Sequence, residues 1–214
     1  MDYSGLQARA ALLTSLEGWT DVANPPDWTI LVNQAWLQFS WDSEYLIGTT
    51  TVTTAPGTMS YILPGGQQWK RLLDVVWDSA GTPQPVDRST EDYERFLSGD
   101  WRTQSSGVPL RFTFNTPNTI SLIPPPNAVK SVLVRGIAQG SAMALSTDLP
   151  GQVSGVGTAI PDVFHEAIAE YAAWLWAQSY YRGDATARMQ GWLSYYQGQV
   201  QDAKNHADPQ KENR

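Results

Sequence analysis

Three carboxylates, Glu91, Asp92 and Glu94, form the group of side chains best suited to acid–base chemistry. Two carboxyl groups about 5 to 10 Å apart can hydrolyse a glycosidic bond. The same acids follow Ser89, and they suit the first turn of a short helix that runs through Leu97, where a hydroxyl caps free amides and negative charge is favoured. Capping accounts for the cluster, and a hydrolase using Glu91 or Asp92 stays a minor alternative.

The other candidates for catalysis or metal binding are sparse. The chain has no cysteine and only two histidines, His165 and His206. Thiolate chemistry and thiolate metal sites are therefore excluded. His165 with Glu166 or Glu170 supplies at most a partial set of metal ligands, and no Gly-Lys-Ser/Thr phosphate loop occurs. We predict that the protein is not an enzyme and uses no metal and no cofactor.

Aromatic residues are abundant: the chain has ten Trp, nine Tyr and five Phe in 214 residues. Exposed indoles could stack on sugar rings, so a carbohydrate- or receptor-binding module that uses Trp69, Trp77 or Trp101 is the main alternative function. Most of the tryptophans, however, fall on stripes expected to face a core. A surplus of apolar surface therefore has to be buried within the molecule or against partners.

The charge pattern argues against binding to nucleic acid or membrane. The formal net charge is −7, and the 14 basic residues are scattered, whereas tight binding to phosphates needs a clustered basic surface. The most apolar stretch, residues 167–177, is short and contains Glu170, so we expect neither a membrane span nor a signal peptide.

Hydrophobic periodicity predicts an α+β fold, in which a helical bundle formed by N- and C-terminal helices carries an inserted antiparallel β region. Apolar residues recur with helical spacing before residue 47, where Asp27 caps the second helix, and again after Pro161. Between them the period is two. The expected parts are N-terminal helices in 1–47, a β-rich insert in 48–138, a flexible loop in 139–160, a helical hairpin in 161–200 and an extended tail in 201–214.

The helix expected after Pro161 has apolar residues on two sides. Trp174 and Trp176 lie about 200° apart on an α-helix, so one core cannot cover both. A chain with few helices has little to cover the second side, which favours a contact between subunits over burial within one. The predicted subunit interface consists of Ala169, Ala173, Trp176 and Tyr180.

The last segment of the chain is polar throughout. Residues 201–214 contain no Val, Ile, Leu or aromatic residue and cannot bury enough apolar area to offset the entropy of ordering. We expect this tail to become ordered only on a partner. Its candidate contact residues are Gln201, Asp202, Lys204, His206, Asp208, Pro209, Lys211 and Arg214.

The order of these parts resembles the head-to-tail adaptor (connector) proteins of tailed bacteriophages. The resemblance covers most of the chain, and its most specific motif is the entry Ile160-Pro161-Asp162-Val163-Phe164-His165 to a helix rich in Ala and aromatic residues. The other matching motifs are Val32-Asn33-Gln34-Ala35, Gly107-Val108-Pro109, Ile120-Ser121-Leu122-Ile123-Pro124-Pro125-Pro126 and Val132-Leu133-Val134.

The resemblance implies a structural virion protein of the neck, present in the host cytoplasm during assembly. Such proteins form a homo-oligomeric ring, commonly twelvefold like the portal, which extends the DNA channel and provides a platform for a tail or nozzle protein. Their C-terminal extensions often dock on the portal protein, a role implied here for residues 201–214. The acidic net charge agrees with a channel through which DNA passes without specific binding.

Overall fold

The structure is a computed structural model, and it describes residues 1–16, 26–64, 68–116, 118–153, 156–157, 159–181 and 187–207. The chain divides into two compact units. A helical unit comprises Met1–Leu46 and Gly140–Arg214, and a β unit comprises the inserted Ile47–Gln139. The mixture of helices and sheets is the predicted α+β class.

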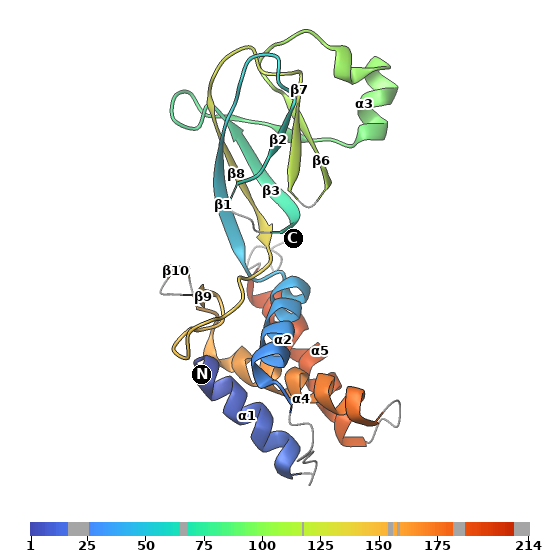
Figure 1. The fold of residues 1–214 in the computed structure, drawn as a ribbon. Helices are drawn as coiled ribbons and strands as arrows, with labels where there is room; N and C mark the ends of the chain where they lie inside the picture. The colour runs from blue at the N-terminus through green and yellow to red at the C-terminus, as the bar shows by residue number, and fades with distance from the viewer. Residues whose placement is uncertain are drawn as a thin grey trace. The chain divides into compact units, whose positions relative to one another are not determined.

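The helical unit is built around one central helix. Among the residues described, its α-helices are α1 (Tyr3–Leu16), α2 (Trp28–Ser43), α4 (His165–Tyr181) and α5 (Ala187–Ala207). Helix α4 contacts each of the other three, and α1 and α5 also contact α2 (Figure 1). Helices from both ends of the chain therefore share one core.

Local sequence signals set the starts of these helices. The carboxylate of Asp27 accepts hydrogen bonds from the backbone amides of Thr29 (3.0 Å) and Ile30 (3.3 Å), which confirms it as the N-cap of α2. Pro161 does not open α4 directly. A short 3₁₀ turn, Asp162–Phe164, follows it, and the α-helix begins at His165.

The segment predicted as a flexible loop is held to the helical unit by hydrogen bonds. The Asn33 side chain donates to the carbonyl of Met143 (2.9 Å) and accepts from its amide (2.7 Å). Trp36 Nε1 donates to the carbonyl of Ser141 (2.9 Å), and the indole leaves no room for a Cβ atom at Gly140. The expectation of a flexible loop is wrong for residues 140–153. That expectation used only the absence of a periodic apolar pattern, which does not report hydrogen bonds to the backbone. This segment ends in β9 (Gln152–Val153), which pairs with β10 (Val156–Gly157).

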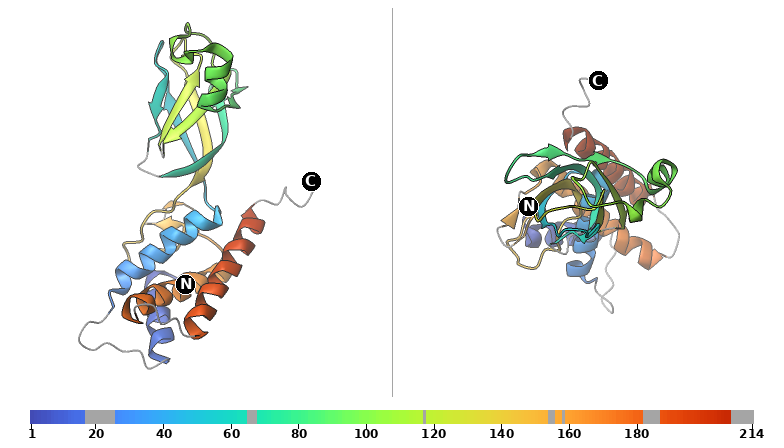
Figure 2. Two further views of the ribbon diagram at one scale, coloured as in Figure 1. Left: turned by 90° about the vertical axis from the view of Figure 1, so that its right-hand side faces the viewer. Right: turned by 90° about the horizontal axis from the view of Figure 1, so that it is seen from above.

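The β unit consists of two four-stranded sheets, seen from two directions in Figure 2. The first has the order β1 (Ile47–Thr53), β8 (Ser131–Ala138), β3 (Trp69–Trp77) and β4 (Gln84–Pro85). The second has the order β2 (Ser60–Ile62), β7 (Thr119–Ile123), β6 (Arg111–Thr116) and β5 (Asp87–Arg88). All pairs are antiparallel except β5 with β6, which is parallel, so the prediction of a purely antiparallel region is wrong at that edge.

One segment of the β unit belongs to both sheets. Strand β4 pairs with the end of β3 at Val76 and Trp77, and after Val86 the chain continues as β5 on β6. The Val86 amide still donates to the Val75 carbonyl (2.9 Å). The segment from Gln84 to Arg88 thus passes from the edge of the first sheet to the edge of the second. The chain then continues into the short helix α3 (Glu91–Ser98).

Candidate interaction surfaces

The residues predicted to form the subunit interface lie inside the helical unit. Ala169 and Ala173 are fully buried, and Trp176 is only 6% exposed, with its ring centroid 6.1 Å from that of Trp28. The Tyr180 side chain lies outside the described part. The assignment of Ala169, Ala173 and Trp176 to a contact between subunits is therefore corrected, because α1, α2 and α5 pack around α4. The assignment of Tyr180 stays a prediction.

The polar segment predicted to be an extended tail begins as helix. Helix α5 continues to Ala207, so Gln201, Asp202, Lys204 and His206 are helical, which corrects the expectation for this part. Ala203 is buried, and the imidazole of His206 stacks on Tyr45 at a centroid distance of 6.1 Å and an angle of 5°. A small alanine and a stacked imidazole pack this turn without any large aliphatic residue. The remaining predicted contacts, Asp208, Pro209, Lys211 and Arg214, lie outside the described residues.

The three tryptophans of the alternative binding function are not at the surface. Trp69, Trp77 and Trp101 are each at most 3% exposed in the β unit. Trp69 and Trp77 belong to the core between the sheets, and the guanidinium of Arg102 lies 4.5 Å from the Trp101 ring centroid. An indole that is buried in its own unit cannot stack on a sugar ring. The premise of the carbohydrate-binding alternative is therefore contradicted.

The carboxylates near residue 91 have structural partners. Glu94 is fully buried and accepts from Arg111 Nε (2.6 Å) and Nη2 (3.0 Å), as well as from the Ser89 hydroxyl (2.6 Å). Glu91 accepts from Arg102 Nη2 (3.4 Å). Of the two acids that a hydrolase would need, one is used for an ion pair and the other, Asp92, is almost fully exposed. This geometry holds α3 in place and offers no pair of free carboxylates.

His165 also has a packing role. The side chain is buried, and its Nε2 atom lies 3.2 Å from the carbonyl oxygen of Ile160. Burial lowers the pKa of His165, so the ring is neutral near pH 7. Within the described residues no three His, Asp or Glu side chains gather to hold a metal ion. In the same part of the chain no helix has the length and hydropathy that crossing a bilayer needs.

Helix α3 turns a charged residue toward the core of its unit and apolar residues toward solvent. Thr90, rather than the predicted Ser89, is its N-cap and accepts from the Tyr93 amide (3.2 Å). The inner side of the helix carries the buried carboxylate of Glu94, while three apolar side chains at helical spacing are exposed to solvent. These three residues, the α3 stripe, are Tyr93, Phe96 and Leu97. Phe96 is 85% exposed, more than any other large apolar side chain among the described residues.

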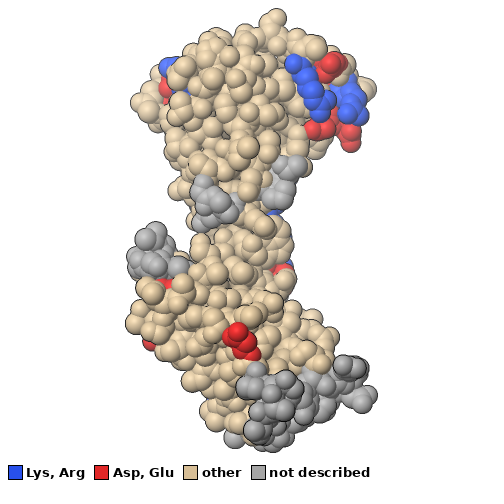
Figure 3. All heavy atoms as spheres, viewed as in Figure 1, with Lys and Arg blue, Asp and Glu red and all other residues tan. Residues whose placement is uncertain are grey.

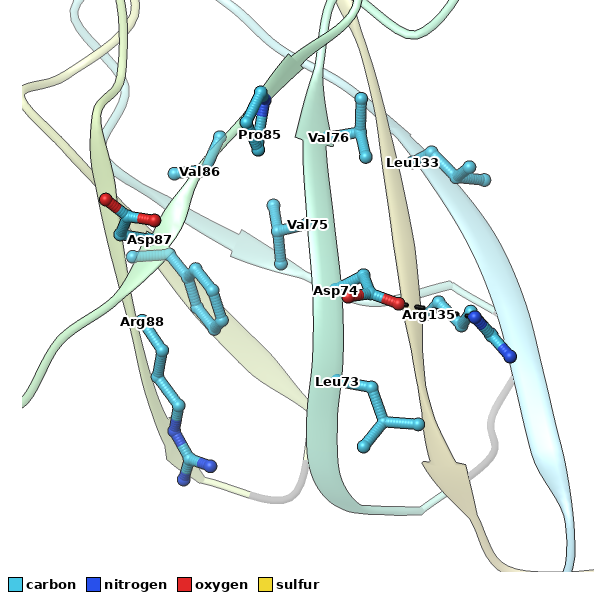
Figure 4. Close-up of a pocket in the computed structure, with 11 residues that line it drawn as sticks. Leu73, Asp74, Val75, Val76, Pro85, Val86, Asp87, Arg88, Leu133 and Arg135 are labelled. Atoms are coloured by element: carbon cyan, nitrogen blue, oxygen red, sulfur yellow. Dashed lines mark hydrogen bonds and ion pairs between the residues drawn. The ribbon is translucent and has the colours of Figure 1, made fainter. Parts of the chain in front are cut away.

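A groove of about 460 Å³ lies beside β3, where the chain crosses from one sheet to the other. Val75, Val86 and Phe112 are its buried lining, and Leu73 and Leu133 are apolar residues that remain partly exposed. Figure 4 shows Val75 and Val86 between β3 and the crossing segment, with Val76 on the other side of β3. We call this site the β3 groove. The remaining lining residues are Asp74, Val76, Pro85, Asp87, Arg88 and Arg135.

Charged side chains of both signs accompany these two features. Asp74 and Arg135 form an ion pair of 3.4 Å beside the β3 groove, drawn as a dashed line in Figure 4. In Figure 3, basic and acidic side chains gather over the part of the β unit that carries α3, and the rest of that face shows few charges. The neighbourhood of α3 is therefore a charged rim around an apolar stripe.

Sequence reasoning did not find either surface. The signal for the α3 stripe was present, because Tyr93, Phe96 and Leu97 have i, i+3, i+4 spacing around Glu94. Periodicity alone cannot tell which side of a helix faces the core. The β3 groove has no sequence signal of this kind, since it depends on where β4 ends.

The comparison with protein families gives a match over the full length. The family model for the SU10 adaptor protein matches residues 1–214. The chain belongs to the SU10 adaptor protein family. No curated protein matches the chain. Membership in this family of phage adaptors indicates a structural role in a phage particle and supports the predicted resemblance at the level of the family.

Proposed function

We propose that the protein is the head-to-tail adaptor of a tailed phage, forming a ring below the portal. The ring extends the DNA channel and provides the attachment platform for a tail or nozzle protein. The observation that carries this proposal is the match of the adaptor family to residues 1–214. A twelvefold ring matches the symmetry common among portals.

The charge distribution supports a channel that does not retain DNA. The net charge is −7, and the 14 basic residues are spread along the sequence. Scattered bases make few simultaneous phosphate contacts, so few counterions are released and affinity stays low. We expect no binding of double-stranded DNA in fluorescence anisotropy at about 0.15 M salt. At this concentration tight binding needs several basic side chains that contact phosphates at the same time.

The C-terminal segment is the proposed portal contact. With the helix continuing to Ala207, the docking segment is reduced to residues 208–214. This segment contains no large apolar residue and has Asp208, Lys211 and Arg214 among its charged residues. A polar peptide of this kind gains order from hydrogen bonds and ion pairs with a partner surface.

Binding to purified portal protein of the same phage tests both parts of the proposal. We expect the full chain to co-elute with the portal in size-exclusion chromatography, and a variant ending at Ala207 to bind at least tenfold more weakly. A variant with residues 208–214 in scrambled order is the matched control for length and charge. If the shortened variant binds as tightly as the full chain, the tail assignment is wrong. If the full chain does not bind portal at all, the adaptor role is wrong.

A further inference from the structure

The α3 stripe is held outward by the polar contacts on the other side of the helix. Glu94 is the buried residue of α3, and its bidentate ion pair with Arg111 fixes the rotation of the helix about its axis. With Glu94 facing inward, the Phe96 side chain two positions later has to face solvent. An exposed group of large apolar side chains with a charged rim is typical of a protein interaction site.

The β3 groove is suited to receive such a stripe. Its lining is aliphatic and aromatic at Val75, Val86 and Phe112, and its volume of about 460 Å³ lies within the range of clefts that hold bulky apolar groups. On the β4 side, within the described residues, β3 pairs with β4 at Val76 and Trp77, and the Val75 carbonyl accepts from the Val86 amide. Leu73 precedes these bonds and is 37% exposed, so the groove is open next to it.

The two surfaces use different residues of the same unit. The α3 stripe lies in Glu91–Ser98, and no residue of that helix lines the β3 groove. A protrusion and a complementary pocket at different places on one molecule give a heterologous contact, in which each copy binds the next one. Such contacts form a ring when the rotation between copies closes, and an open filament when it does not. A stripe that paired with the same stripe on a second copy would instead give a twofold dimer and leave the groove empty.

The charges at the two surfaces are compatible with each other. Asp92 and Arg95 flank the α3 stripe with largely exposed side chains, and Asp87 and Arg88 are exposed at the β3 groove. Asp74 and Arg135 also line the groove, where they pair with each other at 3.4 Å. Each surface therefore offers both carboxylates and guanidiniums to its counterpart. Pairs of opposite sign across the contact favour one orientation of the two copies and disfavour partners of uniform charge.

From these observations we propose that the α3 stripe of one copy docks in the β3 groove of the next copy. Phe96 is the central apolar residue of the contact, with Tyr93 and Leu97 beside it, and Leu73 and Leu133 receive them. The proposal rests on the ring of the proposed function, and it assigns one subunit contact of that ring to named surfaces.

Disulfide trapping tests this contact directly, because the natural chain contains no cysteine. The variants are Phe96→Cys, Leu133→Cys and the double variant, and each replaces a side chain that is at least 36% exposed. A disulfide forms only where two Cα atoms come within about 7 Å. The matched control combines Phe96→Cys with Val129→Cys, an exposed position of the same unit that does not line the groove.

We expect the double variant to give a ladder of covalent multimers under mild oxidation, and an equimolar mixture of the two single variants to give dimers. The control pair should give at least tenfold less cross-linking. Phe96→Ser should abolish the ring in electron micrographs, with circular dichroism unchanged. Dimers formed by Phe96→Cys alone as efficiently as by the mixture would show a twofold contact and overturn the proposal.

The portal-binding assay separates this proposal from the proposed function. Portal-bound rings without the Phe96–Leu133 cross-link would overturn the contact and leave the adaptor role intact. A cross-linked ladder from a protein that does not bind portal would support the contact and contradict the adaptor role. Absence of both the cross-link and portal binding would overturn the two together.

Discussion

The substitution Glu94→Ala removes the central anchor of α3. The Glu94 side chain is 0% exposed and accepts three hydrogen bonds, two from Arg111 and one from Ser89. Without the carboxylate, the Arg111 guanidinium and the Ser89 hydroxyl both lose a charged acceptor. Alanine is at least as good a helix former as glutamate, so any loss of stability comes from these contacts and not from helix propensity.

The expected magnitude follows from the burial of the pair. Removing one partner of a fully buried ion pair costs about 3–5 kcal/mol. The Arg111 side chain is 31% exposed, so water can replace part of the lost interaction. We therefore expect Glu94→Ala to lower the free energy of unfolding by about 2–3 kcal/mol. The double variant Glu94→Leu/Arg111→Met removes both charges, and its stability should lie within about 1 kcal/mol of the natural chain.

Urea unfolding followed by tryptophan fluorescence measures these differences. The matched control is Asp92→Ala on the same helix, where the side chain is 96% exposed and 3.9 Å from Arg95, and the expected loss is below about 0.5 kcal/mol. Equal stability of Glu94→Ala and Asp92→Ala would refute the reasoning that a buried ion pair orients α3.

Three further predictions concern the helical unit. Trp176→Ala should lower the free energy of unfolding in urea by about 3–5 kcal/mol, because it leaves a cavity beside Trp28. Rings should still form on the portal. A folded variant that no longer forms rings would show that Trp176 belongs to the subunit interface. Burial, together with the nearby Glu166 carboxylate, raises the pKa of Glu170 from 4.5 to about 7, so the native chain binds more protons than the unfolded chain between these values and its stability falls as pH rises. Glu170→Gln should therefore gain about 1–2 kcal/mol relative to the natural chain at pH 8 and almost nothing at pH 4, and unfolding curves at both pH values check this. Asp27→Ala should lower stability by about 1 kcal/mol through loss of the α2 cap, whereas an unchanged urea midpoint would contradict the cap.

The sequence predicted most elements because each has a local physical cause. The cap of α2 at Asp27 and the strand β3 over Trp69–Trp77 follow from capping and from period-two patterning. Strands β4 and β5 have two residues each and were not predicted, since two residues carry no periodicity. The ordered segment after Gly140 was not predicted, because the side chains of Asn33 and Trp36 bind its backbone carbonyls. Contacts to backbone groups leave no apolar pattern in the sequence.

The interaction surfaces were harder to predict than the fold. The spacing correctly gave two apolar sides on α4, but which helices cover them depends on tertiary packing, and the surplus near Trp176 is buried by the chain itself. At α3 the opposite occurs: Phe96 is exposed because the Glu94–Arg111 pair takes the inner position. Both outcomes depend on contacts between residues far apart in the sequence, and a pattern within one helix does not contain them.

Electron cryo-microscopy of purified portal protein mixed with an excess of the full chain is the most direct test of the adaptor role. We predict an additional ring of density on one end of the portal, with as many copies of this chain as there are portal subunits. Portal particles that stay unchanged while both proteins are folded would contradict it.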